Sequence, residues 1–305
     1  MPDVQRITLP APAKLNLFLH ITGRRDDGYH SLQTVFQLLD YGDELSFAAR
    51  GDGELTLACT GPQAMDTVAA DDNLVLRAAR ALRDHAGRAD LGADIILSKR
   101  LPTGGGVGGG SSDAATTLLA LNQLWDLQRD DDTLAALGRK LGADVPVFVR
   151  GHSAWAEGIG EALTPVDLPE RWYLVVHPGC HVSTAEVFSH PQLTRDTPAI
   201  TIRAFFAGAS RNDCEALVRR LFAPIDKALI WLENSKNAVG QARMTGTGAC
   251  VFVAFATQGD ARAAQQALVA HMPAQWQSFV ARGVDRSPAR RELAAAGVGA
   301  ATDAT

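Results

Sequence analysis

Apolar and polar residues alternate near the start of the chain, where Leu15, Leu17 and Leu19 are interleaved with Lys14 and Asn16. A period of two predicts an extended strand over residues 6–22, with the side chains of Lys14 and Asn16 on one face. Short apolar segments bounded by turn residues predict further strands. These cover residues 34–39, 43–47, 54–59, 93–97, 145–149, 154–157, 172–177, 249–255 and 276–280.

Apolar residues three and four positions apart predict helices. The first such pattern runs from Leu74 to His85, after Asp71-Asp-Asn73 and before Gly87, which are residues typical of helix ends. Further helices are predicted over residues 113–125, 133–141, 183–188, 211–233 and 260–271. The segment 294–305 is rich in alanine and glycine, and we expect a disordered tail there.

The order of these elements predicts the fold class. Strands and helices are mixed without the regular βαβ period of a doubly wound sheet, so we expect an α+β fold. A chain of 305 residues exceeds the usual size of one hydrophobic core. We therefore expect two domains or one elaborated domain. A domain boundary is predicted at residues 165–171, which are rich in proline and charge, with domains over 1–165 and 166–293 and the tail beyond.

The composition narrows the class of protein. Hydrophobic residues make up 46% and charged residues 21%, as in ordinary globular proteins. A net charge of −5 argues against general binding to nucleic acids or membrane surfaces. The four cysteines are far apart and predict free thiols, and no apolar run approaches the roughly 20 residues of a membrane span. The first residues lack the features of a signal peptide, so we expect a cytoplasmic protein.

A glycine-rich segment, Leu101-Pro-Thr-Gly-Gly-Gly-Val-Gly-Gly-Gly-Ser-Ser-Asp113, precedes the predicted second helix. Glycines here would let the backbone approach a ligand closely or adopt positive φ. A glycine loop that opens a helix directs several N–H groups and the positive end of the helix dipole at an anion. We therefore predict a phosphate site, with a flexible linker as the alternative.

Two familiar phosphate motifs do not fit this loop. A Walker A loop needs a lysine after its last glycine, whereas Gly110 is followed by Ser111 and Ser112. The spacing of a dinucleotide fingerprint is met trivially by six glycines, and its acidic partner residue is missing. The remaining prediction is a loop whose backbone and serine hydroxyls bind a triphosphate or Mg²⁺, with helix capping as the alternative role of the serines.

Three segments resemble the motifs of the GHMP kinases. They are Ala11-Pro-Ala-Lys-Leu-Asn-Leu17, the loop Pro102–Ser112, and Thr245-Gly-Thr-Gly-Ala-Cys250. Asp27-Gly-Tyr-His30 and Leu141-Gly-Ala-Asp-Val-Pro-Val-Phe148 add to the resemblance, which covers residues 7–286. It implies a ribosomal-type N-terminal domain and a ferredoxin-like C-terminal α/β sandwich.

The resemblance implies transfer of the ATP γ-phosphate to a hydroxyl group, with ATP as co-substrate and Mg²⁺ as cofactor. Lys14 and Asp144 match the catalytic residues, and Asn73 matches an ATP contact. The alternatives are an edge-strand lysine, a loop aspartate and a helix cap, respectively. The other residues implied to bind ATP are Pro102, Thr103, Gly104, Gly105, Gly106, Val107, Gly108, Gly109, Gly110, Ser111 and Ser112.

Finer features imply a small-molecule substrate that carries a cytidine diphosphate group. Tyr29 and His30 match a cytidine pocket, and Phe188 matches a second stacking aromatic, with a core position as its alternative. Asn16 and Thr247 match substrate contacts, although Thr247 also suits an ordinary tight turn.

One departure and three rival functions remain. Asp113 replaces the alanine found in many superfamily members, and no glutamate for Mg²⁺ can be placed, so the metal ligands stay unassigned. The rivals are another small-molecule GHMP kinase, a catalytically silent nucleotide-binding protein, and a nucleic-acid-binding protein, which the acidic balance disfavours. No feature of the sequence fixes an oligomeric state.

Overall fold

A computed structural model describes residues 6–26, 28–63 and 72–302, with backbone only for 296–302. Asp27 of the Tyr29–His30 motif and Asp71 before the first predicted helix lie outside the described residues, as do residues 1–5 and 303–305.

The strands are β1 Arg6–Arg24, β2 His30–Arg50, β3 Leu55–Thr60, β4 Gly92–Ser98, β5 Ala154–Glu157, β6 Ala162–Pro165, β7 Trp172–His177, β8 Ala238–Met244, β9 Val251–Phe255 and β10 Gln277–Val284. The helices are α1 Leu74–Ala86, α2 Gly109–Leu124, α3 Asp131–Arg139, α4 Val145–Arg150, α5 Thr184–Ser189, α6 Ile202–Phe206, α7 Glu215–Leu221, α8 Ala223–Glu233, α9 Gln258–His271 and α10 Pro288–Thr302.

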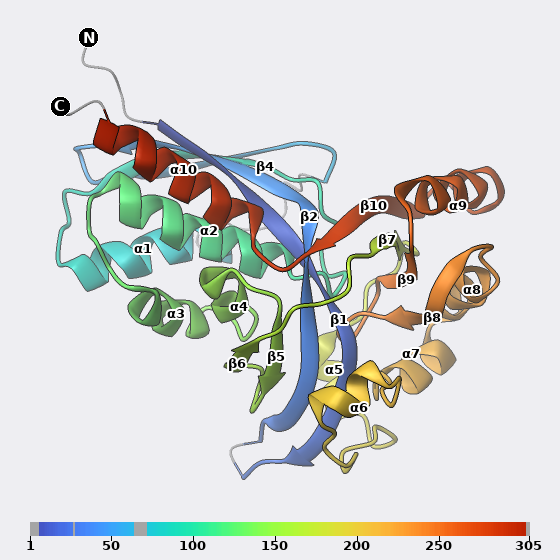
Figure 1. The fold of residues 1–305 in the computed structure, drawn as a ribbon. Helices are drawn as coiled ribbons and strands as arrows, with labels where there is room; N and C mark the ends of the chain where they lie inside the picture. The colour runs from blue at the N-terminus through green and yellow to red at the C-terminus, as the bar shows by residue number, and fades with distance from the viewer. Residues whose placement is uncertain (1–5, 27, 64–71, 303–305) are drawn as a thin grey trace.

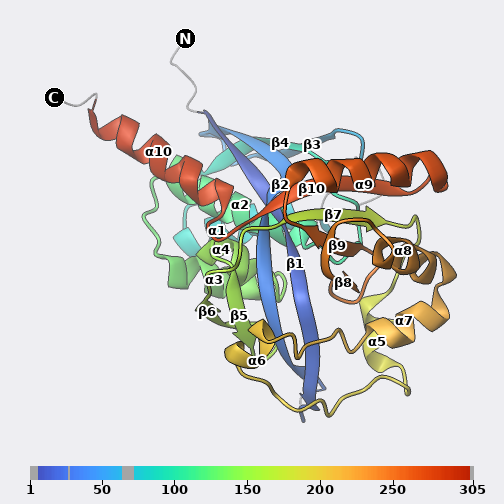
Figure 2. The ribbon, with the colours of Figure 1, turned by 45° about the vertical axis from the view of Figure 1, so that its right-hand side comes forward.

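One mixed sheet runs through both halves of the molecule, in the order β3-β4-β2-β10-β7-β9-β8. The long strands β1 and β2 form an antiparallel pair that crosses the centre, with α1–α4 on one side and α7–α9 on the other (Figures 1 and 2). The α+β class is therefore confirmed. Because β10 joins β2 through Gly283 and Val284, the two halves share a sheet, and the division at residue 165 stays a prediction.

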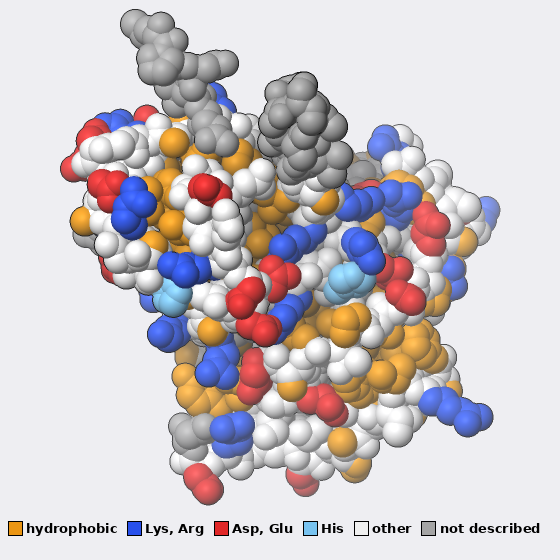
Figure 3. Space-filling model, turned by 60° about the vertical axis from the view of Figure 1, so that its left-hand side comes forward, with side chains coloured by type: hydrophobic (Ala, Val, Ile, Leu, Met, Phe, Trp, Pro, Cys, Tyr) orange, Lys and Arg blue, Asp and Glu red, His pale blue; other side chains and the backbone are white. Residues whose placement is uncertain are grey.

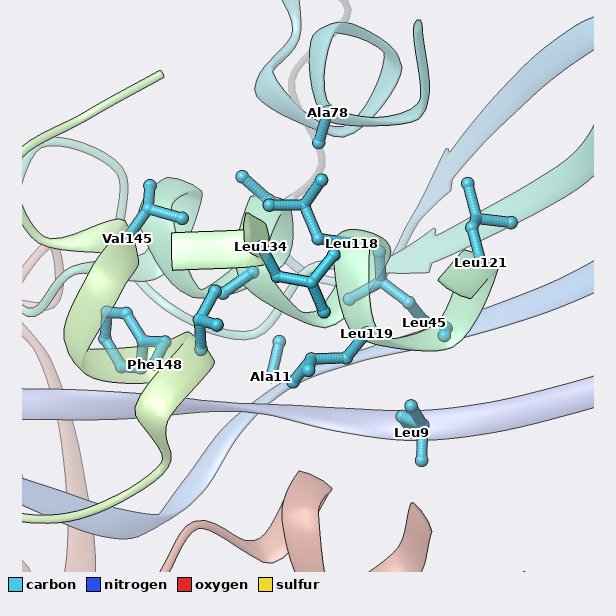
Figure 4. Close-up of a cluster of buried hydrophobic side chains, with 14 of the residues drawn as sticks. Leu9, Ala11, Leu45, Ala78, Leu118, Leu119, Leu121, Leu134, Val145 and Phe148 are labelled. Carbon is cyan, nitrogen blue, oxygen red and sulfur yellow. The ribbon is translucent and has the colours of Figure 1, made fainter. Parts of the chain in front are cut away.

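The largest core cluster lies in the N-terminal half around α2. Figure 4 shows side chains of α2 between α1, the helices α3 and α4, and the strands β1 and β2. The side chains of this cluster are almost completely buried. They include Leu9, Ala11, Leu45, Ala78, Leu118, Leu119, Leu121, Leu134, Val145 and Phe148. This packing holds the first turn of α2 in place and so positions the glycine loop before it.

Helix α2 begins at Gly109, four residues before the predicted start at Asp113. Its N-cap is Gly108, whose φ of 75° is left-handed and suits glycine. Ser111 and Ser112 consequently lie inside the first turn, so the alternative role of these serines as N-caps was wrong.

The strand predicted over residues 145–149 is helix α4, which is a correction. Valine favours strands, but Pro146 sits in the first turn, where the missing N–H costs nothing, and Gly151 ends the helix with a φ of 68°. The apolar residues that suggested a strand are buried on all sides, and this burial overrides intrinsic propensity.

Other boundaries also differ from the prediction. Residues 294–302 continue helix α10, in keeping with the strong helix propensity of alanine, and the disordered tail expected over 294–305 stays a prediction. Strand β2 is continuous where two strands were predicted. The single helix predicted over 211–233 is interrupted, because a new helix, α8, begins at Ala223 with Pro224 in its first turn. Strand β8 and helix α6 were missed.

Surface charge, helix length and the cysteines complete the description of the fold. On the face drawn in Figure 3, Lys and Arg side chains are interspersed with Asp and Glu. No helix among the described residues is long and apolar enough to cross a membrane. All four cysteines lie in the described part of the chain, and none of them forms a disulfide there. The cytoplasmic location stays a prediction.

Candidate active site

The glycine loop joins β4 to α2 and is bonded to segments from both halves of the chain. The amide of Lys14 donates to the carbonyl of Val107 at 2.9 Å, and the amide of Cys250 donates to that of Gly105 at 3.0 Å. Gly106 has a φ of 73°, and a Cβ atom there would lie 2.4 Å from the carbonyl oxygen of Thr245. The close approach of these backbones therefore requires glycine.

A pocket of about 640 Å³ opens at this loop. The first turn of α2 contributes Gly109, Gly110 and Ser111 to its wall, so the positive end of a 16-residue helix faces the pocket. The rest of the lining comes from β3, β4, the start of α1, the glycine loop with the residues around it, the second turn of α2 and the N-cap of α4. It comprises Leu57, Cys59, Leu97, Lys99, Asp72, Asn73, Leu74, residues 102–108, Asp113 and Asp144. Apolar walls beside a helix N-terminus suit a nucleotide, with the base against the walls and the phosphates at the helix.

Lys14 and Asp144 form an ion pair at the edge of this pocket. The Nζ atom of Lys14 lies 3.1 Å from Oδ2 of Asp144 and 2.5 Å from Oδ1 of Asn16. Lys14 is only 3% exposed, whereas the side chain of Asp144 is 32% exposed and lines the pocket. Asp144 is the N-cap residue of α4, but its side chain makes no capping hydrogen bond. The carboxylate is therefore directed by Lys14 rather than by the helix.

Asn16 is used within the protein. Besides accepting from Lys14, its Nδ2 group donates to the Thr34 hydroxyl at 3.0 Å. The backbone N–H of Asn16 donates to the Thr245 hydroxyl at 2.9 Å, and that hydroxyl donates to the Gly106 carbonyl at 3.1 Å. Strand β1, the third motif and the glycine loop are thus linked by consecutive hydrogen bonds. The prediction that Asn16 contacts substrate stays a prediction.

A buried charge cluster lies behind the first turn of α2. The ammonium of Lys99 is 2.5 Å from Oδ2 of Asp43 and 2.8 Å from Oδ2 of Asp113. Burial raises the pKa of Asp113 to about 7, with Lys99 lowering it and Asp43 raising it. Burial lowers the pKa of Lys99, but the two carboxylates outweigh this effect and the net shift is upward. The cluster places a cation in the pocket wall beside Gly109, where a Cβ atom would lie 3.1 Å from Nζ.

Tyr29, His30 and Phe188 lie at the far end of the β1–β2 pair. The rings of His30 and Phe188 are stacked, with centroids 5.1 Å apart and an interplanar angle of 27°. Tyr29 is 62% exposed. Burial lowers the pKa of His30, and the positive charges of Arg195 and Arg24 lower it further. The sequence prediction thus identified aromatic residues that share one location, apart from the pocket at the glycine loop.

Asn73 and Thr247 have structural partners as well as predicted functional roles. Asn73 caps α1 by accepting from the Val75 amide at 2.9 Å, and it also lines the pocket. Thr247 is 2.9 Å from the hydroxyl of Thr184, hydroxyl to hydroxyl. Both predicted roles stay predictions.

Four residues that organise the site were not among the predicted site residues: Asp43, Lys99, Thr245 and Arg195. Lys99 directly precedes the loop, and Thr245 opens the third motif, so proximity to a motif was an available signal for both. Asp43 and Arg195 reach their partners only through tertiary folding, and no local pattern marks them.

The chain is similar to known kinases along nearly its whole length. Sequence profiles match GHMP kinases N terminal domain over residues 73–152 and GHMP kinases C terminal over residues 196–274. A Pseudomonas aeruginosa protein named 4-diphosphocytidyl-2-C-methyl-D-erythritol kinase is 57% identical over 288 residues, or 94% of this chain and 98% of that one. A protein of the same name from Alkalilimnicola ehrlichii is 58% identical over 90% of each chain.

Solved structures of the same group of kinases are also similar to this chain. The crystal structure of 4-(cytidine 5'-diphospho)-2C-methyl-D-erythritol kinase matches with a TM-score of 0.75 and 33% identity, covering 91% of this chain and 100% of that chain. A mevalonate kinase matches with a TM-score of 0.67 at 15% identity, covering 92% of this chain and 100% of that one, which shows a shared fold.

Proposed function

Because the chain belongs to the GHMP kinases and, within them, to the 4-diphosphocytidyl-2-C-methyl-D-erythritol kinases, we propose that it phosphorylates that compound. The γ-phosphate of ATP is transferred to the 2-hydroxyl group, giving the 2-phosphate, ADP and a proton. The reaction is a step in the non-mevalonate synthesis of isoprenoid precursors.

The observation that carries the proposal is the position of the Lys14–Asp144 pair at the edge of the glycine-loop pocket. Phosphoryl transfer requires little covalent chemistry from the protein, so catalysis depends on positioning and charge. The loop and the N-terminus of α2 offer the electrostatic environment that a triphosphate needs. Asp144 shares this pocket and is the carboxylate nearest to Lys14 among the described ion pairs.

In the proposed mechanism, Asp144 orients the attacking hydroxyl or accepts its proton as the bond to phosphorus forms. Lys14 holds the carboxylate in one direction and stabilises the negative charge that develops between hydroxyl and phosphate. Asn16 and Phe36 fix the ammonium, since Nζ also lies 5.3 Å from the centroid of the Phe36 ring. The buried lysine is therefore in place before substrate arrives.

ATP is the co-substrate of this kinase family, and we propose that Mg²⁺ accompanies it. The described residues contain no group of three or more His, Cys, Asp or Glu side chains suited to a metal ion. Mg²⁺ often keeps several waters and takes few protein ligands beside phosphate oxygens. The hydroxyl of Ser111 lines the pocket and suits such a ligand, whereas Ser112 is fully buried. Bound Mg²⁺ would neutralise charge on the phosphates.

The cytidine group is proposed to bind at Tyr29, His30 and Phe188. The stacked pair of His30 and Phe188 offers an aromatic face for a base, and exposed Tyr29 lies next to His30 in the chain. Binding here leaves the methylerythritol unit to reach toward Lys14 along β1.

An ADP-coupled assay of the purified protein tests the function. We expect turnover that depends on ATP, Mg²⁺ and 4-diphosphocytidyl-2-C-methyl-D-erythritol. Turnover with mevalonate or homoserine but not with this substrate would contradict the specific assignment. If none of these three acceptors raises the rate of ADP release above the rate without acceptor, the result would favour a catalytically silent nucleotide-binding protein.

A further inference from the structure

The guanidinium of Arg195 connects the two aromatic residues of the proposed base pocket. Its Nε donates to Nε2 of His30 at 3.1 Å. Its Nη2 donates to the carbonyl of Phe188 at 2.8 Å, and to that of His190 at the same distance. Its Nη1 donates to the Leu193 carbonyl at 3.0 Å. One side chain therefore holds the His30 ring and the end of helix α5, which carries Phe188.

The hydrogen bond to His30 has a chemical consequence. Arginine has five N–H donors, no acceptor, and does not lose its proton in proteins. Nε2 of His30 must then supply a lone pair and cannot carry a proton. Burial and the nearby charges of Arg195 and Arg24 lower the His30 pKa and keep the ring neutral. A neutral imidazole without a proton on Nε2 carries it on Nδ1.

We propose that Arg195 is a positioning residue that fixes His30 as the Nδ1–H tautomer and thereby makes the base pocket select cytosine over uracil. An Nδ1–H group is a hydrogen-bond donor. O2 is an acceptor in both bases, but N3 is an acceptor in cytosine and an N–H donor in uracil, so a donor that faces N3 distinguishes them. Two opposed donors leave both unsatisfied, which disfavours uracil.

The second role of Arg195 supports the first. By binding the Phe188 carbonyl, the same guanidinium sets the distance between the Phe188 ring and the His30 ring, whose centroids are 5.1 Å apart. A fixed donor is useful for recognition only if the stacking surface beside it is also fixed. The inference rests on the proposed function, because that function is what assigns a cytidine group to this pocket.

The tautomer is measured directly by ¹⁵N NMR of histidine-labelled protein without substrate, with His30 assigned by comparison with His30→Gln. We expect a protonated Nδ1 and an unprotonated Nε2 for His30 at neutral pH. A proton on Nε2 in the unaltered protein would overturn the proposal, whatever its variants do.

Selectivity is measured by the affinities for CDP and UDP. In the unaltered protein we expect CDP to bind roughly ten- to a hundredfold more tightly than UDP, the range set by an unpaired buried donor. Arg195→Met should lose most of this ratio and show a mixture of His30 tautomers. Arg24→Met is the matched control, because it removes the other nearby positive charge without touching the Nε2 hydrogen bond. This variant should keep both the CDP preference and the Nδ1–H tautomer of His30.

The outcomes separate this inference from the proposed function. A CDP preference that survives in Arg195→Met, or that is absent from a protein active on the cytidine substrate, would overturn the role of Arg195 alone. A protein that does not phosphorylate the cytidine substrate would contradict the proposed function, while the NMR result would still decide the tautomer.

Discussion

The Nζ atom of Lys14, from strand β1, lies 3.1 Å from Oδ2 of Asp144, at the start of helix α4. The lysine is almost completely buried and the aspartate is partly exposed in the pocket. The cation thus acts from inside the protein on a carboxylate that substrate can reach. This asymmetry distinguishes the pair from a surface ion pair, whose contribution is usually small.

Replacing Lys14 by methionine keeps a long side chain but removes the charge. In the proposed mechanism the ammonium orients Asp144 and stabilises developing charge, so kcat should fall about 10²- to 10³-fold, the range for loss of one such donor. Steady-state kinetics with ADP detection measures the effect. Lys227→Met, at an exposed lysine of α8, is the control and should leave kcat unchanged. Equal kcat in both variants would remove Lys14 from the mechanism.

Replacing Gly108 by alanine should destabilise the protein. Its φ of 75° is unfavourable for alanine, and the Cβ atom would lie 2.9 Å from Cζ of Phe148 and 3.0 Å from Cγ of Lys14. We expect the free energy of unfolding in urea to fall by about 1–3 kcal/mol. Gly110→Ala lies in the helix without positive φ and should be neutral or stabilising by up to about 1 kcal/mol. The reverse order would refute the packing described here.

Asn73→Ala separates helix capping from nucleotide binding. Loss of the bond to the Val75 amide should cost about 1 kcal/mol of stability. Asp130→Ala removes the corresponding cap of α3, where Asp130 accepts from the Thr133 amide at 2.8 Å, outside the pocket. Both variants should lose similar stability, but KM for ATP should rise only in Asn73→Ala. An unchanged KM would leave Asn73 with capping alone.

Asp113→Asn should alter how stability depends on pH. The folded pKa of Asp113, about 7, exceeds the unfolded value of about 4, so the folded protein binds more protons between these values. This group therefore lowers the free energy of unfolding as pH rises from about 4 to about 7, by up to about 1.4 kcal/mol per pH unit. The asparagine variant should lack this component. Parallel pH profiles from urea denaturation of the two proteins would contradict the raised pKa of Asp113.

Much of the fold follows from local pattern. The alternation around Lys14 placed this residue and Asn16 on one face of a strand, and their side chains are in contact. The glycine triplets located the loop that lines the pocket, because a close backbone approach and positive φ both require glycine. These features depend on neighbours in the sequence, which is why they were predictable.

The prediction failed where tertiary contacts determine the secondary structure or the partner of a side chain. Residues 145–149 look like a strand in isolation, but packing against α2 and α3 and the position of Pro146 favour a helix. The bonds of Lys99 to Asp43 and of Arg195 to His30 join residues far apart in sequence. Nothing in the neighbouring sequence distinguishes Asp43 or Arg195 from ordinary surface charges, whereas Lys99 at least stands beside the glycine loop.

The central claim is that Asp144 directs a substrate hydroxyl at the ATP γ-phosphate. ³¹P NMR of the reaction with 4-diphosphocytidyl-2-C-methyl-D-erythritol tests it by following the new phosphomonoester signal. We predict that Asp144→Asn binds ATP nearly as well as the unaltered protein but forms this product roughly 10²- to 10⁴-fold more slowly, the range for lost acid–base catalysis. Product formation at the unaltered rate would contradict the account.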